Sequence, residues 1–371
     1  MRTETIELTG ASPGLRHTLL ALHYGQPGRG PKAYIQAALH GDEIPALLVA
    51  QALRTALVAL EAAGAVLGHI VLVPCANPVG LAQQTLGLHQ GRFDLRDGVN
   101  FNRLIPDLTE AVALAVADEL GADAAANVVV IRQALRDAAA ALTANDPVTD
   151  LKKQLLHWAT DADIVLDLHC DLQATLHLFG LTPQADLLAE LGALMGAQAI
   201  LLATESGDSP FDEACSRPWF ELQRRHPQHP VPLACFSTTV ELRGESDTSH
   251  ELAQQDALAI LEFLRRCGVL AGTPQPLPAP RCQPTLLAAS EPITAPRSGI
   301  VVFHAQPGDH VAAGTVVADL VDVDSGDVLP LRAQSAGVLY ARCTTRWARP
   351  GQPLAKIAGT TLARTGKLLS A

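Results

Sequence analysis

The stretch Ala33–Glu43 (AYIQAALHGDE) decides the fold. Its first seven residues form an apolar run that is typical of a buried strand, and the apolar periodicity of residues 45–63 indicates a helix that begins with a tolerated proline. His40 and Glu43 lie in the loop between these two elements. The stretch therefore predicts a strand–loop–helix unit with polar side chains at the carboxyl end of its strand, where α/β sheets bind ligands.

Similar units follow along the chain and predict an α/β domain. Two or three Ala-rich helices are expected within 108–160, further helices at 183–195 and 253–267, and a loop around 206–218. We expect strands at 5–8, 18–23, 69–74, 164–168, 175–179, 199–202 and 237–241. Strands that alternate with helices favour a mixed, mostly parallel sheet with helices on both faces.

The composition changes after residue 270. Residues 271–284 contain five prolines in fourteen positions, which is typical of a stiff linker. Beyond them the chain is rich in short β segments separated by turn signals. The sequence thus predicts an α/β domain over residues 1–270, a Pro-rich linker over 271–290 and a small all-β domain over 291–371.

Charge and cysteine usage exclude several classes of function. The chain of 371 residues has 27 Lys and Arg against 38 Asp and Glu, a net charge of −11, and no basic cluster that would follow a nucleic-acid backbone. Its N-terminus lacks the apolar core of a signal peptide and its apolar stretches are broken by polar residues, so we expect a cytoplasmic protein with no membrane partner. Seven scattered cysteines without a CxxC pair indicate reduced thiols, and a metal would then be bound by His and carboxylate.

His40 and Glu43 form the sharpest local motif. A His and a Glu three residues apart can each supply one ligand to Zn²⁺, and His169, after the expected strand 164–168, is placed to supply a third. Such a site leaves one position for a water whose pKa the metal lowers. A His-x-x-Glu pair alone also occurs by chance. Asp167 either orients a ligand or is an ordinary polar residue at the end of a strand.

A second cluster lies in the irregular stretch that ends near residue 106. Arg103 offers a planar fork for a carboxylate and Asn102 an amide donor, with Arg92 and Arg96 just upstream. Several arginines in one loop of an acidic protein indicate a pocket for a small anionic substrate. The alternative is a solvated loop with surface arginines.

Glu241, at the end of a β-branched strand, is the candidate general base. It would take a proton from water and deliver it to a leaving amine. A structural salt bridge, for instance to Arg243, is the alternative, and Glu245 competes for the same role.

Taken in order, these motifs resemble the succinylglutamate desuccinylase/aspartoacylase family, a branch of the zinc carboxypeptidase-like hydrolases. The resemblance covers nearly the whole chain. It implies one Zn²⁺ per chain on His40, Glu43 and His169, Glu241 as general acid/base, and a substrate carboxylate on Asn102 and Arg103. It also implies that Arg92 polarises the scissile carbonyl, although Arg96 is close enough to compete, and it makes a homo-oligomer plausible.

The sequence departs from the family at one motif. The family commonly has Asp-Leu-Asn-Arg where this chain has residues 100–103, Asn-Phe-Asn-Arg, so the identity of the substrate does not transfer. The C-terminal segments 295–301 and 307–314 resemble hairpins of biotinyl/lipoyl carrier domains. Because residues 315–340 contain no lysine to carry a cofactor, we interpret this domain as a cap over the active site.

The resemblance and the residues together predict a zinc-dependent deacylase that hydrolyses the amide bond of a small N-acyl amino acid or a related amide. A metallocarboxypeptidase acting on peptide C-termini is the first alternative, disfavoured because the additional β domain would narrow access. A metal-binding protein without turnover is the second, and Glu241 argues against it.

Overall fold

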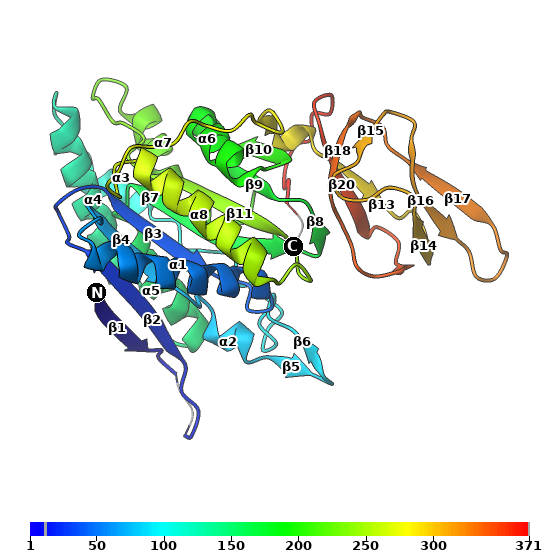
Figure 1. Ribbon diagram of the computed structural model, residues 1–371, viewed down its shortest axis with the longest axis horizontal. Helices are drawn as coiled ribbons and strands as arrows, with labels where there is room; N and C mark the ends of the chain where they lie inside the picture. The colour runs from blue at the N-terminus through cyan, green and yellow to red at the C-terminus, as the bar shows by residue number, and fades with distance from the viewer. Residues whose placement is uncertain (11–12, 370–371) are drawn as a thin grey trace.

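The computed structural model describes residues 1–10 and 13–369, and within them a nine-stranded sheet forms the centre of the N-terminal part (Figure 1). Its strand order is β1-β2-β4-β3-β7-β11-β9-β10-β12. These strands are β1 (Arg2–Glu7), β2 (Thr18–Gly25), β3 (Lys32–Ala37), β4 (His69–Val73), β7 (Ile164–Asp171), β9 (His177–Leu181), β10 (Ala199–Ala203), β11 (Phe236–Gly244) and β12 (Thr285–Leu286).

The centre of this sheet is parallel. Strands β4, β3, β7 and β11 pair in parallel, whereas β1–β2, β2–β4 and β9–β11 pair antiparallel. The expected mixed, mostly parallel sheet is thereby confirmed. The register places Glu241 of β11 directly beside His169 of β7, because the carboxyl ends of parallel neighbours meet at one edge.

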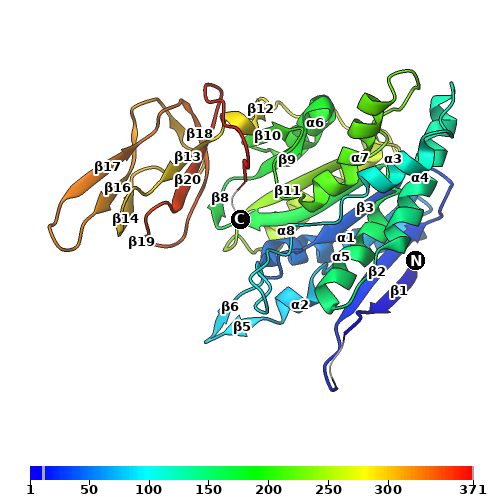
Figure 2. The ribbon, with the colours of Figure 1, turned by 180° about the vertical axis from the view of Figure 1, so that it is seen from behind.

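Helices cover both faces of the sheet, as Figures 1 and 2 show from opposite sides. One face packs against α1 (Ile44–Ala62), α6 (Ala185–Met195) and α8 (His250–Arg266). The other packs against α3 (Thr109–Val116), α4 (Ala124–Ala141), α5 (Pro147–Ala159) and α7 (Phe211–Arg225). Each apolar strand face is therefore buried under a helical layer, which explains the continuous apolar runs of β3, β4 and β7.

Helix α1 is long and apolar enough to cross a membrane, with a mean hydropathy of 1.5, and no other helix of the described ranges meets that test. In the structure its apolar face packs on the sheet, with Val49, Leu53 and Leu57 fully buried. Its hydropathy is thus explained by its position against the sheet.

The C-terminal part consists of short strands in two further sheets beside β8 and β9 (Figure 2). One sheet contains β13 (Glu291–Thr294), β15 (His310–Val311), β18 (Gly337–Arg342) and β20 (Pro353–Gly359), and the other β14 (Gly299–Phe303), β16 (Val316–Val321), β17 (Val328–Arg332) and β19 (Trp347–Ala348). A short strand of the N-terminal part, β8 (Gln173–Ala174), pairs with β18. The C-terminal unit is therefore joined to the chain segment that follows His169.

Two expectations differ from the structure. The loop expected over 206–218 ends at Pro210, and α7 begins at Phe211 and contains Pro218. Asp212 and Glu213 in its first turn stabilise the helix N-terminus through the macrodipole. Pro218 in the same stretch favoured a loop, so the sequence did not reveal this helix. The expected linker over 271–290 also contains β12, which pairs with β10 as the outermost strand of the large sheet.

Remaining short elements surround these layers. They are α2 (Pro78–Leu81), β5 (Gln84–Thr85), β6 (Leu88–His89), and the 3-10 turns Thr182–Gln184 and Leu287–Ala289. Strands β5 and β6 form a small hairpin that extends from the site end of the molecule (Figure 1).

Candidate active site

Three buried side chains converge at the carboxyl ends of β3 and β7: His40, Glu43 and His169. The Nδ1 atoms of His40 and His169 each lie 2.7 Å from a different oxygen of the Glu43 carboxylate. One ligand atom from each residue lies within 4.8 Å of the other two. Two imidazoles and one carboxylate are the donor set of many catalytic zinc sites, so these residues fit the metal that the sequence predicts.

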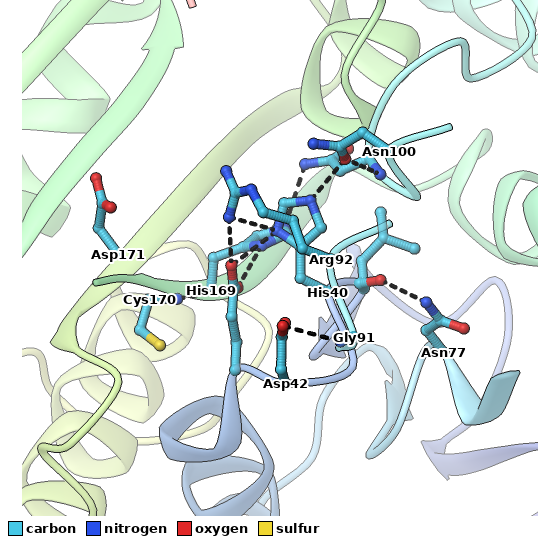
Figure 3. Close-up of polar contacts among 12 residues, drawn as sticks. His40, Asp42, Asn77, Gly91, Arg92, Asn100, His169, Cys170 and Asp171 are labelled. Atoms are coloured by element: carbon cyan, nitrogen blue, oxygen red, sulfur yellow. Dashed lines mark hydrogen bonds and ion pairs between the residues drawn. The ribbon is translucent and has the colours of Figure 1, made fainter. Parts of the chain in front are cut away.

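The outward-facing nitrogens of both histidines are fixed by neighbours, and Figure 3 shows Asn100 beside His40. Asn100 Oδ1 accepts from the backbone N–H of Asn102, which identifies it as the oxygen, and it lies 2.8 Å from His40 Nε2. That nitrogen therefore donates, and Nδ1 keeps its lone pair for a metal. Nε2 of His169 forms an ion pair with Asp167 at 2.9 Å. The orienting role considered for Asp167 thus has a matching geometry.

Asp167 is itself held by a buried hydrogen-bond chain. Gln36 Nε2 donates to Asp167 Oδ1 at 2.8 Å, and the Tyr34 hydroxyl donates to Gln36 Oε1 at 2.7 Å. All three residues are fully buried. Because this chain holds one oxygen of the Asp167 carboxylate in place, it fixes the other oxygen, which lies 2.9 Å from Nε2 of His169.

Electrostatics within the cluster favour an ionised Glu43. Burial alone would raise the pKa of Glu43, but the two neighbouring imidazoles lower it below its usual range. Burial lowers the pKa of His40, and the charge of Arg92 adds to that effect. Burial also opposes protonation of His169, whereas the charges of Asp167 and Glu43 raise its pKa well above the usual value. The cluster thus offers a carboxylate and a neutral imidazole at ordinary pH.

Arg92 reaches the cluster from a loop that packs closely on the His40–Glu43 loop. The N–H of Gly41 donates to Gly91 O at 2.8 Å, and a Cβ on Gly91 would lie 2.1 Å from the backbone nitrogen of Asp42. Only glycine permits this approach. The guanidinium of Arg92 consequently lies 3.2 Å from Glu43 Oε1. Figure 3 shows Arg92 next to His40.

Glu241 lies beside the cluster at the cavity surface, partly exposed. Burial and the charge of Glu43 raise the pKa of Glu241 to about 8. Its Oε2 atom has no hydrogen-bond partner in the described residues. The alternative role for Glu241, a structural salt bridge to Arg243, is not found in the described residues, because Arg243 pairs with Asp256. Glu245, the other candidate base, is exposed and does not line the cavity.

One cavity brings most of the expected residues together. His40, Arg92, Asn102, Arg103, His169 and Glu241 all line it. The Asn102 side chain is also used within the protein, because its oxygen accepts from Phe211 N at 2.8 Å and its Nδ2 lies 3.3 Å from His169 Nε2.

Arg96 is not brought to this cavity. Its guanidinium forms ion pairs with Asp94 at 2.6 Å and with Asp146 at 2.8 Å. Both aspartates bind the guanidinium of Arg96. Of the two arginines considered for a contact with the substrate carbonyl, only Arg92 therefore lies at the cavity.

The cavity also contains charged residues that the sequence analysis missed. Asp171 follows His169 by two residues and therefore faces the same side of β7, which was a usable signal. Lys356 of β20 forms an ion pair with it at 2.9 Å, and only the folded C-terminal unit reveals this contact. Asp212 and Glu213 line the cavity from α7 and lay hidden in the expected loop.

Comparisons with known proteins show similarity to one family of amide hydrolases. Residues 29–267 match the family model described as the succinylglutamate desuccinylase/aspartoacylase catalytic domain. The chain is 26% identical over 348 residues to an N-alpha-acetyl-L-2,4-diaminobutyric acid deacetylase from Halomonas elongata, covering 89% of this chain and 83% of the relative.

Solved structures of the same family have the same overall fold. A family protein from Shewanella amazonensis is 25% identical with a TM-score of 0.84, covering 96% of this chain and 98% of that one. Another from Shewanella frigidimarina is 25% identical with a TM-score of 0.86 and covers 97% of both chains.

Proposed function

The chain belongs to the succinylglutamate desuccinylase/aspartoacylase family, and from this premise we propose that it is a zinc-dependent deacylase that hydrolyses the amide bond of a small N-acyl amino acid. The family consists of amide hydrolases acting on C–N bonds, and the name of the Halomonas relative describes removal of an acetyl group from the α-nitrogen of an amino acid. One observation supports the proposal most: the convergence of His40, Glu43 and His169 beside Arg92 and Glu241 in one cavity.

A zinc ion bound by His40, Glu43 and His169 would polarise the amide carbonyl and make a water molecule acidic enough to attack near neutral pH. The residues of the chain supply the rest. Arg92 is placed to hydrogen-bond the carbonyl oxygen as negative charge develops on it. Glu241, beside the candidate ligands in the same cavity, accepts the proton of the attacking water and delivers it to the leaving nitrogen.

The walls of the cavity favour a small substrate. Leu287, near the end of the linker region, and Lys356 and Leu369, which follow that region, line the same cavity as the candidate ligands. A long peptide would have to pass these side chains, whereas an N-acyl amino acid does not. The C-terminal unit therefore supports a deacylase over a carboxypeptidase.

Release of free amine from a panel of substrates tests this proposal. The zinc-loaded protein is incubated with Nα-acetyl and Nα-succinyl amino acids and with tetrapeptides that have a free C-terminus. We expect turnover of acyl amino acids and none of the peptides. Turnover of the peptides alone would favour the carboxypeptidase, and turnover of neither would contradict the proposal.

A further inference from the structure

The segment after β20, residues 360–369, runs back from the C-terminal unit to the N-terminal part of the molecule, as Figures 1 and 2 show in red. We call this segment the strap. Leu369 lines the cavity that contains the candidate ligands. Leu368 and Leu369 also pack on a small apolar cluster that includes Leu201 of β10 and Leu287. The strap therefore contacts the wall of the cavity, and the proposed hydrolysis gives it no role.

Arg364 holds the strap through three backbone contacts. Its N–H donates to Ala288 O at 2.9 Å, and its Nη1 donates to Ser290 O at 3.0 Å, just before β13. Its Nη2 donates to the backbone oxygen of Leu368 within the strap. Because a guanidinium is a planar group with several fixed donors, one side chain fixes the course of the strap and ties it to the chain before β13.

The strap in turn contacts the loop between β10 and α7. The N–H of Leu368 donates to Ser206 O at 2.9 Å, and a Cβ on Gly207 would lie only 3.3 Å from the strap. Three consecutive residues of this loop have a left-handed backbone: Gly207 with φ 103°, Asp208 with φ 61° and Ser209 with φ 47°. Residues with a Cβ keep this conformation only where their surroundings hold it. The strap holds the loop from one side.

The other side of the loop is bonded to the segment that contains Asn102. The backbone N–H groups of residues 104 and 105 donate to the carbonyl oxygens of Asp208 and Ser209, at 2.8 and 3.1 Å. Phe211, the first residue of α7, donates its N–H to Asn102 Oδ1 at 2.8 Å. Asn102 is buried and lines the cavity. The loop is therefore a bridge of hydrogen bonds between the strap and Asn102.

Building on the proposed function, we propose that the strap positions the substrate α-carboxylate. Arg364 holds the strap, the strap holds the loop before α7, and this loop holds Asn102, where the family resemblance places that carboxylate. Arg364 does not line the cavity, so it is a positioning residue and not a catalytic one. The candidate metal ligands lie at the ends of β3 and β7 and do not depend on this bridge.

Two substrates that differ only in the α-carboxylate test this inference: the most active Nα-acyl amino acid of the panel and its C-terminal methylamide. Release of the acyl acid is followed for both. We expect wild type to prefer the free acid about 10- to 100-fold in kcat/KM, because hydrogen bonds to a charged group contribute that much. Arg364→Ala should reduce this preference about tenfold, through KM of the acid, with little change in kcat. A merely structural role would lower both substrates alike and keep the ratio.

Hydrogen exchange gives a second readout that does not depend on turnover. In Arg364→Ala, the amides of residues 104, 105 and 211 should exchange faster, because their acceptors lie in the released segment. Arg349→Ala, which changes an exposed arginine of the C-terminal unit, is the matched control and should keep both the substrate preference and the exchange rates of wild type. If Arg364→Ala does not fold, Leu368→Pro, which removes the N–H donated to Ser206, replaces it in both measurements.

The outcomes separate this inference from the proposed function. An unchanged preference for the free acid in the strap variant would overturn the inference and leave the deacylase intact, whether or not the exchange rates change. If no acyl amide is hydrolysed, the proposed function fails, and calorimetric binding of L-norvaline against its methylamide then decides the inference. A preference of wild type for the free acid that is lost in the strap variant supports it, and equal preferences in the two proteins overturn it.

Discussion

The Lys356 ammonium, on strand β20 of the C-terminal unit, lies 2.9 Å from Asp171 Oδ2, two residues beyond the candidate metal ligand His169. Both side chains line the cavity that contains the candidate ligands. The C-terminal unit thus contributes directly to the wall of the candidate active site, and an ion pair links the two parts of the molecule there.

This ion pair should make the stability of the protein depend on pH in a defined window. Burial raises the pKa of Asp171, but Lys356 opposes it and the pKa falls to about 2. Because the pKa is lowered on folding, the stabilisation is present above the unfolded value of about 4 and disappears as the pH falls to about 2. We expect Lys356→Met to lower the midpoint of urea unfolding at pH 6, with a difference from wild type that vanishes near pH 2.

Urea unfolding from pH 2 to pH 7 provides the check. Lys367→Met is the control, because Lys367 is 70% exposed and pairs with Asp208 at the surface, where an ion pair contributes little. A Lys356→Met difference that is independent of pH would show that the variant acts through packing and not through Asp171.

Asn100 should determine how tightly the site binds metal. Its side-chain oxygen holds Nε2 of His40 at 2.8 Å, and loss of such a partner typically weakens metal binding about 10- to 100-fold. We therefore expect Asn100→Ala to raise the dissociation constant for zinc by that factor in a chelator competition. Asn145→Ala, at an exposed position, should bind zinc like the wild type. Equal affinities of the two variants would remove Asn100 from the site.

Glu241 should be needed for turnover and not for metal binding. Glu241→Gln keeps the shape of the side chain and removes the base, so kcat should fall about 10²- to 10⁴-fold while zinc content stays unchanged. Glu245→Gln should retain near wild-type kcat, because Glu245 is exposed and outside the cavity lining. The opposite pattern in amine-release kinetics would transfer the role of general base to Glu245.

Close packing of two glycines should position Arg92. A methyl group on Gly91 would overlap the backbone of the His40–Glu43 loop, so Gly91→Ala should cost about 1–3 kcal/mol of unfolding free energy and lower kcat. Gly121→Ala is the control, because a Cβ there meets nothing within 4 Å. Full activity of Gly91→Ala would show that the loop adjusts without displacing Arg92.

The sequence was most informative where a candidate functional residue directly follows an apolar segment with the pattern of a strand. The apolar runs before His40 and His169 predicted parallel strands, and the meeting of strand ends brought the candidate ligands and Glu241 together without knowledge of the packing. Contacts between distant segments were not predictable in the same way. The choice of Arg92 over Arg96 depends on where Asp94 and Asp146 lie, and Lys356 reaches Asp171 across 185 positions of sequence.

Zinc content and turnover of wild type and His169→Ala, measured together on the same purified preparations, test the central claim most directly. The account predicts about one zinc per wild-type chain with release of amine from N-acyl amino acids, and loss of both in His169→Ala while the fold is retained by circular dichroism. Wild-type protein that hydrolyses these amides equally well after complete removal of metal, or a His169→Ala variant with undiminished zinc and turnover, would contradict it.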